Sequence, residues 1–121
     1  MDLNIEKLNE NVAVLREESV CVSAPQDAMD LIATARYETG CGAMILPKAA
    51  LHEDFFKLST GLAGEVLQKF VNYGMRVAIV GDFSHYTSKP LQDFIRESNR
   101  GKTVFFVGTE AEAQEKLNAA N

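Results

Sequence analysis

Three short apolar runs alternate with stretches that have the period of an amphipathic helix, and this alternation constrains the fold most strongly. The runs cover residues 41–46, 76–80 and 103–107, and each is followed at once by proline or glycine. Such runs are typical of strands covered on both faces of a sheet. The run RVAIV (76–80) is the most continuous, so we expect it to be a central strand. Strands that alternate with helices favour parallel, right-handed connections.

The segment ahead of these runs predicts a hairpin and a helix. Residues 3–16 hold two alternating stretches around an Asn-Glu-Asn turn, which is typical of a β-hairpin. Ser23 and Gln26 have the spacing of a capping box, and Pro25 suits the first turn of a helix. Gly40 is placed to end that helix.

A second helical region is predicted between Leu51 and Tyr73, in two pieces separated by Thr60-Gly61. Gly74 is placed to stop it. The longer piece carries a broad apolar stripe, which predicts a buried face; its members are Leu62, Ala63, Val66, Leu67, Phe70 and Val71.

Two more helices follow the later runs. Residues 91–98 have helical spacing of apolar side chains, and Thr109 with Glu112 forms a second capping box for a last helix reaching Leu117. The predicted order is β-β-α-β-α-β-α-β-α in one α/β domain spanning residues 1–121, with a single mixed five-stranded sheet.

Composition excludes several classes of protein. The net charge of −5, with 12 basic and 17 acidic residues, argues against a nucleic-acid binder. We expect no membrane span and no secretory signal, because no apolar stretch is long enough. Only Cys21 and Cys41 occur, too few for a disulfide framework or a zinc site. We therefore expect buried, reduced thiols, a cytoplasmic location and no cofactor.

Polar side chains follow the apolar runs, where the carboxyl ends of parallel strands meet at one edge. Residues 47–54, 81–89 and 108–109 form three such loops. We expect the three loops together to gather the candidate binding residues in one region: Lys48, His52, Glu53, Asp54, Asp82, Ser84, His85, Tyr86, Ser88 and Lys89.

Catalysis is one use of these residue types. Ser84 with His52 or His85 and Asp82 contains the nucleophile, base and acid of a hydrolase. Neighbours in sequence do not converge easily, so His52 from the other loop is the better base. A glycine-flanked nucleophile elbow is absent from the sequence.

Metal and phosphate binding give weaker patterns. His52, Glu53 and Asp54 are consecutive and point in different directions on a helix, so we expect no metal site. Ser88 and Lys89 at a helix start could hold a phosphate, although no glycine-rich loop accompanies them.

A structural interpretation explains many of the same residues. Ser88 or Thr87 suits the cap of the helix that begins near Lys89, and Asp82 can close a turn through its backbone. Tyr86 can pack its ring and expose its hydroxyl. We expect the pairs Phe55-Phe56 and Phe105-Phe106 to belong to the core. The alternative is an exposed short helix at Phe55-Phe56, on which one of the two rings would anchor a partner, because adjacent helical residues cannot both face one core.

Longer stretches carry a family resemblance. QDAMDLIATARY, residues 51–101 and VFFV with the acidic helix behind it resemble the bacterial domain-of-unknown-function family 4180, over roughly residues 25–117. The element order, RVAIVGD, TVFFV and TEAEAQEKL are similar to the STAS fold of anti-sigma-factor antagonists, in its SpoIIAA-like branch.

This resemblance implies a regulatory role. STAS antagonists carry a serine at a strand-to-helix junction whose phosphorylation switches partner binding, and Ser84 and Ser88 are its nearest counterparts here. We therefore expect a non-enzymatic interaction module that presents residues 81–89 to a protein or a small anionic ligand. Homodimerisation through an open sheet edge or the Phe55-Phe56 helix is a further expectation.

Overall fold

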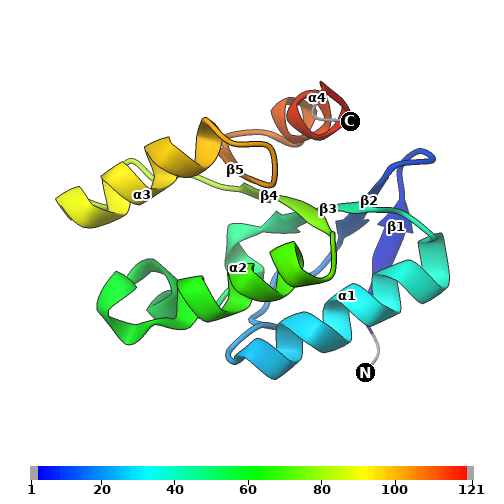
Figure 1. Ribbon diagram of the computed structural model, residues 1–121, viewed down its shortest axis with the longest axis horizontal. Helices are drawn as coiled ribbons and strands as arrows, with labels where there is room; N and C mark the ends of the chain where they lie inside the picture. The colour runs from blue at the N-terminus through cyan, green and yellow to red at the C-terminus, as the bar shows by residue number, and fades with distance from the viewer. Residues whose placement is uncertain (1–2, 120–121) are drawn as a thin grey trace.

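Five strands form one mixed sheet in the spatial order β1-β2-β3-β4-β5 (Figure 1). The computed structural model describes residues 3–119. β1 pairs antiparallel with β2, and the remaining neighbours pair in parallel. The strands are β1 (Ile5–Lys7), β2 (Val12–Leu15), β3 (Ala43–Pro47), β4 (Arg76–Val80) and β5 (Val104–Val107). The prediction for RVAIV is confirmed, because β4 lies between β3 and β5.

Helices connect the strands, so that the chain runs β1-β2-α1-β3-α2-β4-α3-β5-α4. The α-helices are α1 (Pro25–Thr39), α2 (Leu62–Asn72), α3 (Lys89–Asn99) and α4 (Glu110–Ala119). Short 3₁₀ turns precede α2: η1 (Lys48–Ala50), η2 (Glu53–Phe56) and η3 (Leu58–Thr60). The α/β class and the five-stranded mixed sheet predicted from the sequence are confirmed.

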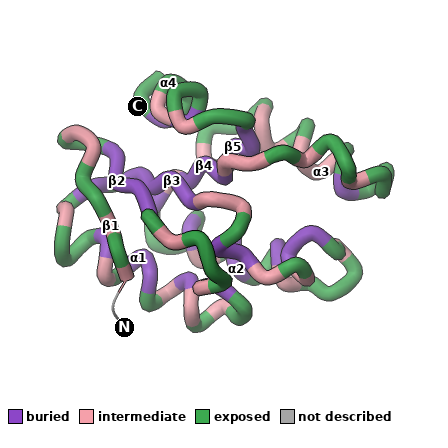
Figure 2. Tube along the Cα trace, turned by 180° about the vertical axis from the view of Figure 1, so that it is seen from behind, coloured by how far each residue is buried: buried purple, intermediate pink, exposed green. Residues whose placement is uncertain are grey.

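The sheet is the middle layer between two hydrophobic cores. Along β4, Val77 and Ile79 pack with buried residues of α1 and α2, whereas Ala78 packs with Ala113 and Leu117 of α4. This alternation follows from the two-residue period of a strand. The inner strands are therefore buried along most of their length, while β1 is largely exposed (Figure 2).

The start of α1 differs from its prediction. Ala24, not Ser23, is the N-cap residue, so no hydroxyl caps this helix. The Asp27 carboxylate instead accepts hydrogen bonds from the backbone amides of Ser23 and Ala24, at 2.9 and 3.1 Å. A carboxylate in the first turn satisfies these amides and also suits the helix dipole. Gly40 ends the helix in a left-handed conformation, as predicted.

Two further expectations need correction. Val71 was assigned to the apolar stripe of α2, but about half of its surface is exposed. Cys41 is buried, as expected, whereas Cys21 is only partly buried; both thiols are free.

A side chain covers the outer edge of β5 at one residue, Phe106. The Asn99 amide donates to the carbonyl of Phe106 at 3.1 Å and accepts from its backbone amide at 2.7 Å. A side chain that mimics a neighbouring strand protects an edge from pairing with another chain. Homodimerisation stays a prediction, and β1 is the remaining edge strand at which the sheet could extend.

In the part of the chain that the structure describes, none of the helices combines the length and the apolarity needed to cross a membrane.

Candidate functional site

The loops that leave β3 and β4 meet through aromatic rings. The ring of Phe56 stacks on Tyr86, with centroids 5.0 Å apart and planes 18° apart, and lies 5.9 Å from the ring of Phe83. Phe83 also packs edge-to-face on Phe106 of β5. The loop 81–88 is therefore fixed at two inward-facing rings, each offset or tilted as aromatic pairs prefer.

Lys48 joins the same two loops by charge. Its Nζ lies 5.0 Å from the ring centroids of both Phe56 and Tyr86, and 4.0 Å from Oε2 of Glu53. The Tyr86 hydroxyl donates to Oε1 of Glu53 at 2.9 Å. Burial and this carboxylate raise the pKa of Tyr86, so the phenol stays protonated near neutral pH. The predicted ring packing of Tyr86 is confirmed, while its hydroxyl is engaged by Glu53.

Gly81 is required at the point where the loops approach. A Cβ at this position would lie 2.6 Å from Cβ of Lys48 and 3.0 Å from its Cδ. The φ angle of Gly81 is not positive, so the requirement is for space and not for an unusual backbone conformation.

The tip of the loop is a polar turn. The Asp82 carboxylate accepts from the backbone amide of Ser84 at 2.9 Å and from its hydroxyl at 2.6 Å. The Tyr86 amide donates to the carbonyl of Phe83 at 3.2 Å, which places Ser84 and His85 at the exposed centre of the turn. The hydroxyl and amide of Ser84 lower the pKa of Asp82. The prediction that Asp82 closes a turn is confirmed.

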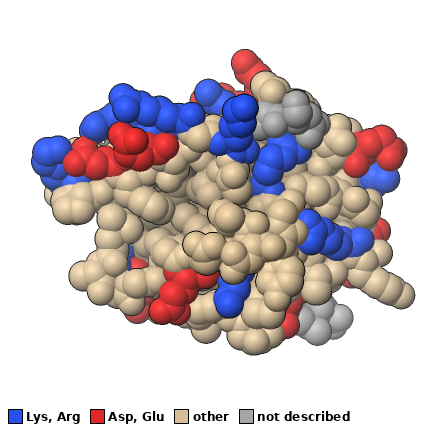
Figure 3. Space-filling model, viewed as in Figure 1, with Lys and Arg blue, Asp and Glu red and all other residues tan. Residues whose placement is uncertain are grey.

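Ser88 begins α3, as one of the two predicted caps. Its hydroxyl oxygen accepts from the Leu91 amide at 3.4 Å, and Pro90 lies in the first turn. Lys89 pairs with Asp93 one turn along, at 2.8 Å, and Arg96 pairs with the same carboxylate. Acidic and basic side chains consequently alternate along the exposed side of α3 (Figure 3).

His52 and Asp54 form a local pair apart from the loop tip. Nδ1 of His52 accepts from the Asp54 amide at 3.0 Å and so caps η2. The Asp54 carboxylate lies 3.7 Å from the same nitrogen. Within residues 3–119, the recorded hydrogen bonds of Ser84 go to Asp82, and none joins Ser84 to either imidazole. A nucleophile–base pair at Ser84 would need this turn to rearrange.

Phe55 and Phe56 are both buried, with exposed fractions of 1% and 4%, so their predicted place in the core is confirmed and the alternative of an exposed ring that anchors a partner is wrong. The segment is a 3₁₀ turn and not an α-helix, and both rings belong to the same hydrophobic core. Phe55 turns toward Phe106, whereas Phe56 is covered by the loop that carries Tyr86. The loop after β4 thus supplies the contacts that bury Phe56. A sequence pattern does not show them, because the two segments are far apart in the chain.

The third loop, residues 108–109, does not share this arrangement. The hydroxyl oxygen of Thr109 accepts from the Glu112 amide at 3.1 Å and its hydrogen points to the Glu112 carboxylate, so it caps α4 as predicted. The recorded contacts of this turn lie within α4 and join none of the candidate residues in the described chain.

Sequence reasoning missed a charged cluster at the same edge of the sheet. Arg16 follows β2 and makes two hydrogen bonds to the Glu110 carboxylate, at 2.8 and 2.9 Å, and a third to Glu6. These carboxylates raise the pKa of Arg16. The sequence pattern did not show this cluster, because it depends on β2 pairing in parallel with β3 and ending at the same edge. No set of three or more metal-ligating side chains converges in residues 3–119.

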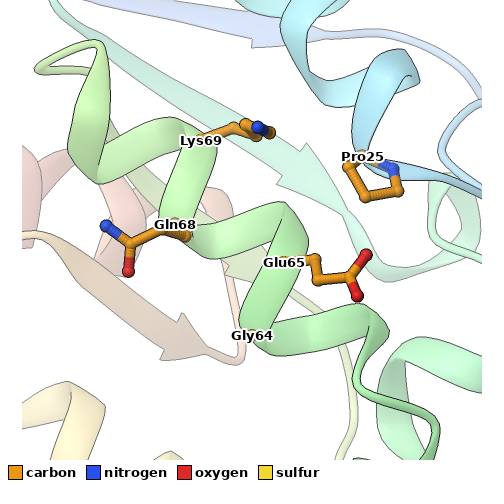
Figure 4. Close-up of a pocket in the computed structure, with 5 residues that line it drawn as sticks. All are labelled: Pro25, Gly64, Glu65, Gln68 and Lys69. Carbon is orange, nitrogen blue, oxygen red and sulfur yellow. The ribbon is translucent and has the colours of Figure 1, made fainter.

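Two surface pockets differ in their relation to the site. A pocket of about 530 Å³ opens between residues 53–59 and 85–91, beside the loop tip. Another, of about 400 Å³, lies between Pro25 at the start of α1 and one side of α2. Figure 4 shows Glu65 and Lys69 pointing toward Pro25 in this second pocket, while Gln68 points away. The first pocket contains predicted site residues and the second contains none.

Comparison with known proteins gives one match. A search of curated proteins and a search of solved structures each found no significant match. A family model described as a domain of unknown function (DUF4180) matches residues 7–117, which include every strand-to-helix loop described above. The chain therefore belongs to the DUF4180 family.

Proposed function

We propose that this protein is a non-enzymatic interaction module that presents the outer side of loop 81–89 to a protein partner. The observation that carries the proposal is the division of the loop into two sides. Phe83 and Tyr86 are held inward by rings of neighbouring elements, whereas Asp82, Ser84 and His85 are exposed at the tip. A loop fixed from within offers polar groups to a partner with little loss of conformational entropy on binding.

The proposal includes a fold relationship and a setting. The mixed sheet with one antiparallel hairpin followed by parallel strands supports a STAS-like, SpoIIAA-like fold. The resemblance of residues 25–117 to a bacterial family supports a bacterial origin. Two unpaired cysteines support a cytoplasmic location, which cell fractionation would test.

A serine switch belongs to the same proposal, and Ser84 suits it better than Ser88. A phosphate on Ser84 would bring a second negative group to the Asp82 carboxylate, which now accepts from that hydroxyl at 2.6 Å. Repulsion would then open the turn. A phosphate on Ser88 would lie at the start of α3, where negative charge is favourable and the loop need not move. Incubation with serine kinases, followed by mapping of the phosphate, tests the switch.

The partner interface is tested with matched variants. Wild type, the loop variant Asp82→Ala/Ser84→Ala/His85→Ala and the control Glu115→Ala/Lys116→Ala, on the exposed side of α4, are used to capture proteins from extracts of the source organism. Each captured protein is then purified and its affinity measured directly. We expect binding to weaken at least about tenfold in the loop variant only. Equal affinity of all three proteins for every captured partner would reject the proposal.

The hydrolase alternative stays a prediction with its own test. Ser84→Ala should abolish any esterase or phosphatase activity of the purified protein if Ser84 is the nucleophile. Activity that survives this substitution, or no activity on a broad substrate panel, would contradict it.

A further inference from the structure

The pocket beside the loop tip has features that the partner interface does not use. Its walls are the 3₁₀ segment before α2 and the start of α3, so it opens between the two loops that the aromatic rings hold together. Its volume of about 530 Å³ lies within the range of sites that take small molecules, about 300–1,000 Å³.

The inner part of this pocket is apolar. Phe56 and Leu91 line it but are already buried, whereas Leu58, Tyr86 and Pro90 still offer apolar surface to a ligand. A ligand that reached these side chains would gain from removing apolar surface from water. The pocket thus favours a ligand with an apolar body.

The rim of the pocket carries hydrogen-bond donors that the protein does not use. Lys57, Ser59 and Thr87 are exposed, and within residues 3–119 their side chains have no recorded hydrogen bond or ion pair. The His85 ring, also at the rim, contacts Tyr86. An ammonium, an imidazole and two hydroxyls around one opening are the groups that bind the oxygens of an anion.

The single carboxylate in the lining is already compensated. Glu53 accepts from the Tyr86 hydroxyl through Oε1 and faces Lys48 through Oε2. The charge left without a counter-ion at the pocket is therefore the positive charge of Lys57, on a protein whose net charge is −5.

We infer that this pocket binds a small organic phosphate monoester, with the apolar body against Leu58, Tyr86 and Pro90 and the phosphate at Lys57, Ser59 and Thr87. A phosphate has three terminal oxygens and can use several donors at once, which suits the number of free groups at the rim. The site shares His85 with the proposed partner interface but otherwise differs from it, because it needs the pocket and not the outer side of Asp82 and Ser84.

Phenyl phosphate is the probe, titrated into the isolated wild-type protein and followed by amide NMR. We expect saturable shifts at residues 57–59 and 85–91, with none at residues 64–69 of the pocket between α1 and α2. Phenol and inorganic phosphate, which each carry half of the probe, should bind at least about tenfold more weakly than phenyl phosphate. Shifts elsewhere, or equal binding of inorganic phosphate, would overturn the inference.

Substitutions assign the binding to the named groups. Lys57→Gln should weaken phenyl phosphate binding at least about fivefold, as expected for loss of a partly exposed ion pair. Lys102→Gln is the control, because it makes the same charge change at an exposed residue outside this pocket. Thermal unfolding checks that both variants fold. Unchanged affinity in Lys57→Gln, or an equal loss in Lys102→Gln, would overturn the site while leaving the partner proposal to its own test.

Discussion

Two turns leave neighbouring parallel strands at the same edge of the sheet and each leads into a helix, but they are built differently. After β5, residues 108 and 109 suffice, and Thr109 caps α4. After β4, the chain uses residues 81–88 before α3 begins. Ser88 alone provides the cap, so the remaining residues of this longer loop serve another purpose.

The difference shows which residues of the longer loop are not needed to connect a strand to the helix that follows it. In the loop after β4, Phe83 and Tyr86 enlarge the core, while Asp82 and Ser84 shape an exposed turn. The turn after β5 has neither feature. Residues beyond those that a cap requires are therefore the best candidates for function, and the following predictions test this contrast.

The largest effect is expected from removing the ring that holds the longer loop. Phe56→Ala should destabilise the protein by about 3 kcal/mol, because a buried aromatic side chain is lost together with its contacts to Phe83 and Tyr86. Urea unfolding measures the change, and hydrogen exchange should rise in residues 81–88 but not in residues 108–109. Equal exchange in both turns would show that Phe56 does not hold the loop specifically.

The substitutions Gly81→Ala and Gly108→Ala, at the glycines that follow β4 and β5, compare the space available in each turn. Gly81→Ala should cost about 2 kcal/mol, because the new methyl group would overlap the Lys48 side chain. Gly108→Ala should cost less than about 0.5 kcal/mol, since its methyl group would lie 3.4 Å from the flexible carboxylate of Glu112.

A double-mutant cycle identifies the cause. In the Lys48→Ala background, part of the overlapping side chain is gone, so Gly81→Ala should cost measurably less than in wild type. The same cost in both backgrounds would assign the strain to the Cβ atom that residue 48 retains, 2.6 Å away, and not to the outer part of the side chain.

Removing either helix cap should destabilise the protein less than the substitutions above. The loss should be larger in the short turn after β5 than in the longer loop after β4. Thr109→Ala should destabilise by about 1 kcal/mol, whereas Ser88→Ala should cost about 0.5 kcal/mol. The hydroxyl oxygen of Thr109 lies 3.1 Å from its amide donor, and that of Ser88 lies 3.4 Å from its own. Chemical denaturation compares the stabilities of the two variants. The reverse ranking would mean that the Ser88 cap stabilises the protein more than the length of its hydrogen bond indicates.

The smallest effect concerns the titration of the loop tip. The Ser84 hydroxyl, followed by its amide, holds the pKa of Asp82 below its usual value. The stability gained from this lowered pKa is present at neutral pH and is lost as the pH falls below about 4. Ser84→Ala should raise the pKa of Asp82 toward the usual value, as measured by carboxyl NMR. Asp93, whose pKa Lys89 lowers, is the control and should not change.

The sequence alone determined the strands, the order of the helices and the central place of β4. The spacing of the apolar residues and the proline or glycine that ends each segment are local features of the chain. The sequence also narrowed the cap of α3 to Ser88 or Thr87 and located the cap at Thr109 and the turn at Asp82, since each depends on residues within three positions. The cap of α1 was misassigned by one position: the predicted pair was Ser23 and Gln26, whereas Ala24 is the N-cap and Asp27 is the residue whose carboxylate accepts from the amides ahead of the helix.

Only the tertiary structure decided how the loops combine. Burial of both Phe55 and Phe56, the position of Lys48 between two rings and the need for Gly81 all depend on contacts between residues far apart in the chain. The pocket at Lys57 and Thr87, and the engagement of Arg16 by Glu110, arise in the same way. Local patterns cannot specify these features, because they result from which strand ends the parallel sheet brings side by side.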